Sequence, residues 1–243
     1  MLKWITECNI FAEPRIAAEG NAKGYREVDI VSKFAVKNME CNICGRMNEI
    51  TILAMGTSEG TADLDFRPPE VRRSAMPLWV HKCDYCRNVF STTDPMPEYD
   101  EKYTDSKEYV NCAGIAGLSE IGKRFVKLAL IYQHCKEYRK AGDAFLCAAW
   151  SCDDEKLDVT AIVCRKRALT CYNEVDVSKI PKRELPELKL RIVDVLRRAA
   201  FFEEAAAFAG QLKFRTEQYI KIQEFQIARA KAGDKKCYKL EDI

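Results

Sequence analysis

The feature that most constrains this chain is a pair of Cys-x-x-Cys motifs, Cys41–Cys44 and Cys83–Cys86, with 38 residues between them. Two residues between cysteines let both thiolates point at one ion from a single tight turn. Four thiolates at about 2.3 Å complete a closed tetrahedral zinc shell. Gly45 follows the first pair, where such turns need a residue that accepts positive φ. The spacing therefore predicts one structural Zn2+ ion, with Cys41, Cys44, Cys83 and Cys86 as its ligands.

Two other roles for these cysteines are less well supported by their surroundings. A thioredoxin-like redox role needs a βαβ setting, which the short strands and loops around each pair do not indicate. A catalytic zinc keeps an open position beside three protein ligands. His81 could replace a cysteine, but it lies in a strand-like run two residues before Cys83. We therefore expect His81 to lie near the site without binding the metal.

The remaining cysteines bear on the cellular compartment. No stretch approaches the roughly 20 apolar residues that cross a bilayer, and the first residues lack an apolar run of signal-peptide length. We expect a cytoplasmic protein without membrane contacts, whose thiols stay reduced. Of the 12 cysteines, eight lie outside the two pairs. They are expected to be small buried residues, apart from Cys112, which we expect to be exposed and reactive.

Composition and periodicity change near residue 110. Residues 1–110 hold 14 Lys and Arg against 18 Asp and Glu, whereas residues 111–243 hold 25 against 19. In the first part, β-branched and aromatic residues predict strands over Ile30–Val36, Glu49–Leu53 and Leu78–Lys82. Residues 93–118 are predicted to be a linker, and about six amphipathic helices follow from Ser119 onward. The chain is thus predicted to be α+β, with a zinc-ribbon-like module and linker over 1–110 and an all-α domain over 111–243.

The helical part contains the pattern of a tetratricopeptide (TPR) repeat. With Gly122 as the first position of a 34-residue unit, small and aromatic residues fall at the usual places, namely Leu128, Ala129, Tyr132, Tyr138, Ala141, Phe145 and Ala148. A weaker second unit starts at Pro186, and residues 156–185 do not fit a third copy. We expect them to be the rest of one long helix, over Asp154–Tyr172, and a loop. A plain helical bundle is the alternative to this TPR-like arrangement.

Stacked helix pairs present a surface that binds peptides or partner proteins, and the first helix of each pair usually lines it. The outward residues expected to contact a partner are Lys123, Gln133, His134, Arg197 and Arg198. The alternative is that each of these side chains is exposed to solvent and contacts no partner. An unpaired end of such a stack also exposes apolar surface, which a second copy of the chain could cover.

Several stretches carry a resemblance to a known group of proteins. They are Cys41–Gly45, Asp63–Asp65, Pro77–Cys86, Leu146–Trp150 and Leu196–Ala205. Over residues 38–235 the chain resembles a bacterial family of unknown function. Its members carry an N-terminal Cys-x-x-Cys…Cys-x-x-Cys zinc module and a C-terminal TPR-like helical region. The resemblance implies this architecture and no particular activity.

Three functions remain open at the level of sequence. The favoured one is a non-enzymatic adaptor, in which a zinc-stapled module displays a helical scaffold to a protein or peptide. Nucleic-acid binding is the first alternative, since basic clusters occur at 165–167, 182–183, 197–198 and 235–236. Against it, the zinc half is net acidic and no basic stripe alternates with aromatic residues. The second alternative is a zinc enzyme. However, the chain has no His-Glu-x-x-His and no phosphate-binding glycine loop.

Overall fold

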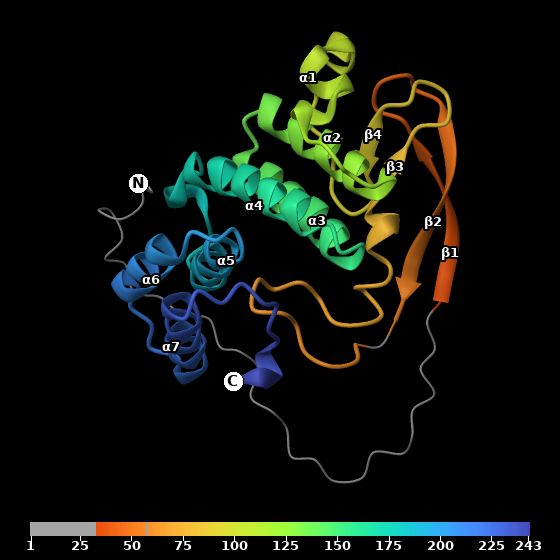
Figure 1. The fold of residues 1–243 in the computed structure, drawn as a ribbon. Coiled ribbons are helices and arrows are strands. Elements are labelled where there is room, and N and C mark those ends of the chain that lie inside the picture. The colour runs from red at the N-terminus through yellow and green to blue at the C-terminus, as the bar shows by residue number, and fades with distance from the viewer. Residues whose placement is uncertain (1–32, 57) are drawn as a thin grey trace, which may run out of the picture.

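The structure is a computed structural model that describes residues 33–56 and 58–243 (Figure 1). Two small antiparallel hairpins come first and helices follow, so the predicted α+β class is confirmed. The strands are β1 (Lys33–Glu40), β2 (Met47–Met55), β3 (Val80–Lys82) and β4 (Val89–Ser91). The helices are α1 (Lys107–Val110), α2 (Glu120–His134), α3 (Tyr138–Asp154), α4 (Asp158–Asn173), α5 (Leu185–Arg198), α6 (Phe202–Gln211) and α7 (Glu217–Lys231).

The first hairpin lies along one side of the molecule, at the right of Figure 1. β1 pairs with β2 in an antiparallel register that places Lys37 opposite Ile50 and Val36 opposite Thr51. Because successive side chains alternate between the two faces, buried Ile50 marks the inner face and exposed Val36 the outer face. The strands predicted around 33–36 and 49–53 are therefore confirmed. Residues 30–32 of the predicted strand lie outside the described residues.

Short turns of one type connect several of the helices. Lys136, Lys156 and Ala200 each adopt a positive φ, of 61°, 59° and 65°. The N–H of the residue after each of them donates to the carbonyl oxygen five positions earlier, at 2.8–2.9 Å. This is the Schellman geometry, which ends a helix and reverses the chain. The single helix predicted over 154–172 is consequently wrong at its start. The turn at Lys156 ends α3, and α4 begins at Asp158.

One hydrophobic core runs from the second hairpin into the helices. Met76, Val80 and Val89 are buried in the same apolar cluster as the side chains of α2, α3, α4 and α5. Residues 93–118, expected to be a linker, include helix α1 and two 3-10 turns, and they contribute Tyr109 to this core. The division at residue 110 stays a prediction about domains, whereas the packing crosses that position continuously.

A stretch between the two cysteine pairs, residues 61–67, lies against the helices; we call it the inner segment. Its Leu64 packs on Leu190 of α5 and on Tyr219 and Ile222 of α7. The C-terminal residues hold it on its other side. There the N–H of Leu64 donates to the carbonyl of Tyr238, and a β-bridge joins Asp63 to Lys239. The inner segment is therefore enclosed between helices and the end of the chain.

Asp65 is the charged centre of this contact. Its carboxylate is fully buried and accepts hydrogen bonds from Trp150 Nε1 of α3 at 2.7 Å and from the Arg198 guanidinium of α5 at 3.1 Å. Arg198 also binds Asp153 at 2.7 Å. Burial disfavours the charged carboxylate, but Arg198, Arg165 and the Trp150 hydrogen bond outweigh it, so the pKa of Asp65 is lowered. The network ties α3, α5 and the inner segment together.

Replacing Asp65→Asn should lower the free energy of unfolding at pH 7 by about 3–5 kcal/mol, because it breaks a buried pair and leaves Arg198 with only the partly exposed Asp153 as its counter-charge. The pH dependence has a definite sign. The folded pKa of Asp65 lies below its unfolded value of about 3.9, so the stabilisation is complete above that pH and is lost as the pH falls through the folded pKa. Guanidinium chloride unfolding between pH 2 and pH 7 measures both effects.

The matched control is Asp105→Asn, since Asp105 is an exposed aspartate in a 3-10 turn. It should change the free energy of unfolding by less than about 0.5 kcal/mol. Equal losses in the two variants would show that Asp65 does not hold the helices and the inner segment together.

Candidate metal centre

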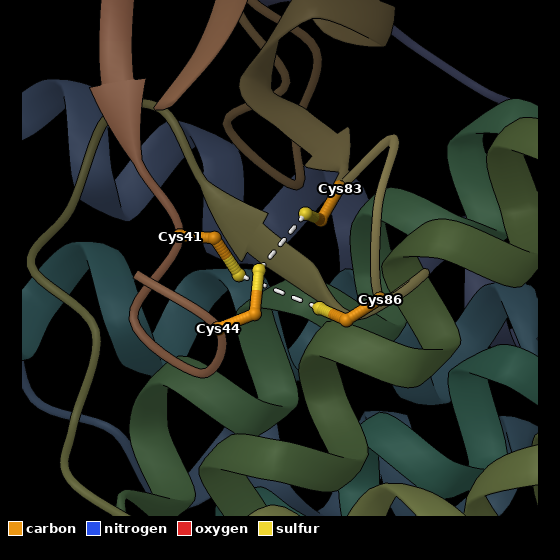
Figure 2. A group of neighbouring side chains, drawn as sticks. All are labelled: Cys41, Cys44, Cys83 and Cys86. Carbon is orange, nitrogen blue, oxygen red and sulfur yellow. Dashed lines mark hydrogen bonds between the residues drawn. The ribbon is translucent and has the colours of Figure 1, made fainter. Parts of the chain in front are cut away.

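The two Cys-x-x-Cys motifs form the turns of the two hairpins. Cys41 and Cys44 lie between β1 and β2, and Cys83 and Cys86 lie between β3 and β4. The strand predicted over Leu78–Lys82 does lead into the second pair, but only Val80–Lys82 is strand, because Leu78 and Trp79 belong to a 3-10 turn over Met76–Trp79. Figure 2 shows the two turns facing each other, so that all four side chains point toward a common centre. The sequence separates the pairs widely, and the fold brings them together.

The sulfur atoms are spaced as a tetrahedral metal site requires. All four Sγ atoms lie within 4.8 Å of one another. Cys41 Sγ is 3.6 Å from Cys86 Sγ, and Cys44 Sγ is 3.7 Å from Cys83 Sγ (dashed in Figure 2). Four sulfurs at about 2.3 Å from a tetrahedral ion would lie about 3.8 Å apart. The four cysteines are therefore placed to hold a metal ion.

Both turns have the same backbone geometry. The N–H of the first cysteine donates to the carbonyl five residues later, from Cys41 to Arg46 at 2.9 Å and from Cys83 to Asn88 at 2.7 Å. The residue after each pair has a positive φ, 67° at Gly45 and 64° at Arg87. The expectation for Gly45 is confirmed. The second turn achieves the same conformation with an arginine, which the sequence alone did not indicate.

Two buried asparagines connect the turns, and sequence reasoning missed both. Asn48, just after the first turn, accepts a hydrogen bond from the N–H of Asp84 at 3.0 Å in the second turn. Asn88, just after the second turn, donates to Asn42 Oδ1 at 3.3 Å in the first. Tyr99 donates its hydroxyl to Asn88 Oδ1 at 2.8 Å and fixes that side chain. An asparagine four residues after Cys44 and another two residues after Cys86 are the only sequence signal for this clamp.

The electrostatics of the cluster favour a bound cation. Burial opposes ionisation of Cys83, but hydrogen bonds from the N–H groups of Cys86 and Tyr85 and from the Asn48 side chain outweigh it, and they lower the pKa of Cys83 to about 6. Burial and the neighbouring thiols raise the pKa of Cys86 to about 12. One thiolate therefore forms readily. Further negative charges in the same space need a cation between them, because like charges repel.

His81 lies close to Cys83 in sequence but does not add a metal ligand to the four cysteines. Within the described residues, the four cysteines are the only group of three or more Cys, His, Asp or Glu side chains close enough to share an ion. His81 lies in β3 with its ring 5.2 Å from that of Phe90, and it is not part of the group. Cys41 and Cys83 are buried with Phe90 in a small apolar cluster, which shields the sulfurs on one side.

The exposure of Cys112 differs from the prediction, whereas the predicted partner-binding residues of α2 are at least partly exposed. Cys112, expected to be exposed, is buried beside α2, and burial raises the pKa of its thiol. Lys123, Gln133 and His134 all lie on α2, where Lys123 and His134 are exposed and Gln133 is half-buried. The His134 ring stacks on Tyr103 with a centroid distance of 4.0 Å. A partner contact at these three residues stays a prediction.

The expectation that Arg197 and Arg198 face outward is wrong. Arg197 has no exposed surface, and its guanidinium donates to the carbonyls of Asp234 and Lys236, both at 2.8 Å. Arg198 is also buried and binds Asp65 of the inner segment. The physical reason is that the inner segment and the C-terminal residues cover this side of α5. These arginines stabilise the fold from within.

Comparisons with known proteins identify no relative: no protein-family model, curated protein or solved structure matches this chain significantly. The bacterial family suggested by the sequence is thus supported only in its general features, namely a four-cysteine cluster among small strands and a helical C-terminal region. In the described part of the chain, no helix combines the length and the apolar character needed to cross a membrane.

The Asn48→Ala variant should weaken metal binding about 10- to 100-fold, because Asn48 both holds the second turn and stabilises the Cys83 thiolate. Competition with a chromophoric chelator measures the dissociation constant. The control is Asn38→Ala, since Asn38 lies exposed on β1 outside the two cysteine turns, and its affinity should equal that of the wild type. An unchanged affinity of Asn48→Ala would contradict the role of the clamp.

Proposed function

We propose that this protein is a non-enzymatic adaptor, in which one structural zinc ion holds a zinc-ribbon-like module on a TPR-like helical scaffold. The observation that carries the proposal is the closed ligand set, since four thiols converge on one point. An ion with four protein ligands in a tetrahedron has no open position for a substrate or water. The geometry therefore favours a structural metal over the alternative of a zinc enzyme.

Zinc is the metal that this ligand set favours. Tetrahedral sites made only of thiolates hold zinc or iron, and four-cysteine sites of this kind are a common form of structural zinc. In such small modules the binding free energy of the ion becomes folding free energy. The first hairpin illustrates the need, because none of the β1 side chains is buried. The ion joins this hairpin to the rest of the molecule.

The helices support the scaffold part of the proposal. α2 packs on α3 and α5 on α6, and each pair is joined by the same left-handed turn, at Lys136 and at Ala200. These are the two pairs that match the repeat pattern in the sequence. Helix pairs of this kind recognise proteins through extended surfaces rather than through pockets.

The outer face of the first hairpin is the surface best suited to a protein partner. Phe34, Val36 and Met55 are 55%, 65% and 62% exposed, which is unusual for large apolar side chains. Exposed apolar patches on a folded protein mark interaction sites. The free edges of this two-stranded sheet can also pair with an extended strand of a partner.

The basic clusters that favoured nucleic acid in the sequence are partly turned inward. Arg165, Arg197 and Arg198 are buried and bind Asp153, Asp194 and Asp65. The guanidinium of Arg167 donates to the carbonyl of Ala113. These arginines leave no continuous basic stripe for a phosphate backbone. Protein binding is therefore the better supported of the two hypotheses.

Removing the metal with a chelator should release the first hairpin while leaving the helices folded. We expect amide hydrogen exchange in β1, β2 and residues 83–90 to accelerate by more than about tenfold, because these segments depend on the ion for their attachment. Exchange in α3 and α5 should stay slow. Elemental analysis of the protein before chelation should give one zinc per chain. Unchanged exchange after complete metal removal would contradict a structural role, and iron in place of zinc would correct the metal.

The double variant Phe34→Ser with Val36→Ser should lose its protein partner, with a reduction in affinity of about tenfold or more, because apolar anchors dominate such interfaces. Affinity capture from the native host, followed by titration of the recovered partner, measures the effect. The control is Asn38→Ser on the same face of β1, which should bind normally. Analytical ultracentrifugation reports whether the partner is a second copy. Recovery of nucleic acid without protein, or equal binding by the double variant, would overturn the adaptor proposal.

A further inference from the structure

A cavity of about 310 Å³ lies where α2, the second hairpin and residues 110–118 meet. None of the four cysteines of the metal site is in its lining. Its charged lining is formed by Lys82, Glu120, Lys123, Arg124 and Lys127. Its volume is at the lower end of the range for small-molecule sites.

The charges around the cavity are strongly unbalanced. Lys82, Lys123, Arg124 and Lys127 face a single carboxylate, Glu120, so the lining has a formal charge of +3 (four cations less one anion). Lys123 binds Glu120 at 2.6 Å, and the charges of Lys82 and Arg124 also act on this carboxylate. Within the described part of the chain, Lys82 and Arg124 form no ion pair of their own. Such a concentration of like charge favours a bound anion.

The backbone beside the cavity has two left-handed residues in succession. Cys112 and Ala113 have positive φ values of 48° and 54°. The N–H of Asn111, just before them, donates to the carbonyl of Lys107 at 3.0 Å and is therefore not available to a ligand. The preference for an anion thus comes from the cationic side chains.

The rest of the lining restricts the size and type of that ligand. Val89, Leu118 and Cys112 are buried and form an apolar wall. Among the residues that the structure describes, no aromatic side chain lines the cavity, so they offer no platform on which successive bases of a single strand could stack. A small anion with a short apolar part fits this combination better than an extended nucleic acid does.

We propose that this cavity binds the phosphate group of a small phosphate monoester. Such a group carries a charge of about −1.5 to −2 near neutral pH and three acceptor oxygens, which suits a lining of +3 that contains one guanidinium and three ammonium groups. A carboxylate carries only one charge and would leave more of the cations unpaired. The site is independent of the metal and of the protein-binding hairpin, so it adds a ligand to the proposed adaptor.

The test titrates the zinc-loaded full chain with phenyl phosphate, benzoate, inorganic phosphate and a 12-nucleotide oligothymidylate, in 0.1 M chloride. Amide chemical shifts in heteronuclear NMR spectra report the binding. We expect saturable changes near Cys112 and in the first turns of α2 with phenyl phosphate, at an affinity about tenfold above that of benzoate. Inorganic phosphate should bind at the same residues more weakly.

Variants locate the site. Arg124→Glu should weaken phenyl phosphate binding about tenfold or more, and Arg124→Gln provides a milder change if the reversed charge disturbs folding. The control is Lys213→Glu, which makes the same charge change at an exposed lysine between α6 and α7 and should bind normally. Zinc content verifies that each variant keeps its metal centre.

Three results would overturn the proposal. The first is the absence of saturable binding by either phosphate. The second is equal binding by the wild type and both Arg124 variants. The third is tight binding of the oligonucleotide without binding of phenyl phosphate, which would assign the cations to a nucleic-acid surface. Loss of the hairpin partner in the adaptor experiment would leave this test unaffected, so the two proposals fail separately.

Discussion

The buried carboxylate of Asp65 is the contact on which the arrangement of the two halves depends. It lies between the two cysteine pairs in the sequence, yet it binds Trp150 of α3 and Arg198 of α5. The chain therefore leaves the first hairpin, crosses to the helices, and returns to form the second hairpin beside α2. This path explains the 38 residues between the cysteine pairs, which exceed what a zinc module alone needs. The spacer is part of the helical core.

The metal centre and the Asp65 network hold different parts of the segment that joins the two cysteine pairs. The sulfur cluster fixes the first hairpin against the second, while Asp65 fixes the inner segment against the helices. Between them, Met76, Val80 and Val89 pack into the helical core. In the proposed function, a structural ion would anchor one exposed hairpin to a body that has its own apolar core, and this arrangement supports an adaptor role.

The tertiary structure also buries several charged side chains of the helical half. Arg197 and Arg198 of α5 form ion pairs with the buried carboxylates of Asp194 and Asp65. The inner segment and the C-terminal residues cover the side of α5 that was expected to contact a partner. Two surfaces keep a character suited to binding. One is the apolar outer face of β1, and the other is the basic cavity at the start of α2. They differ in chemistry, which suggests different ligands.

Much of the local structure followed from the sequence because its causes are local. Cysteine spacing determined the four sulfur ligands, glycine at 45 indicated a left-handed turn, and apolar periodicity indicated the helices. The helix break at Lys156 is also local, but no glycine marks it in the sequence. Other features arise from contacts between distant residues. Asn48 and Asn88 gained their roles only when the two turns met. The inward direction of Arg197 and Arg198 required the chain end and the inner segment to cover α5. Only tertiary structure decides such cases, since a charge is buried or exposed according to what packs over it.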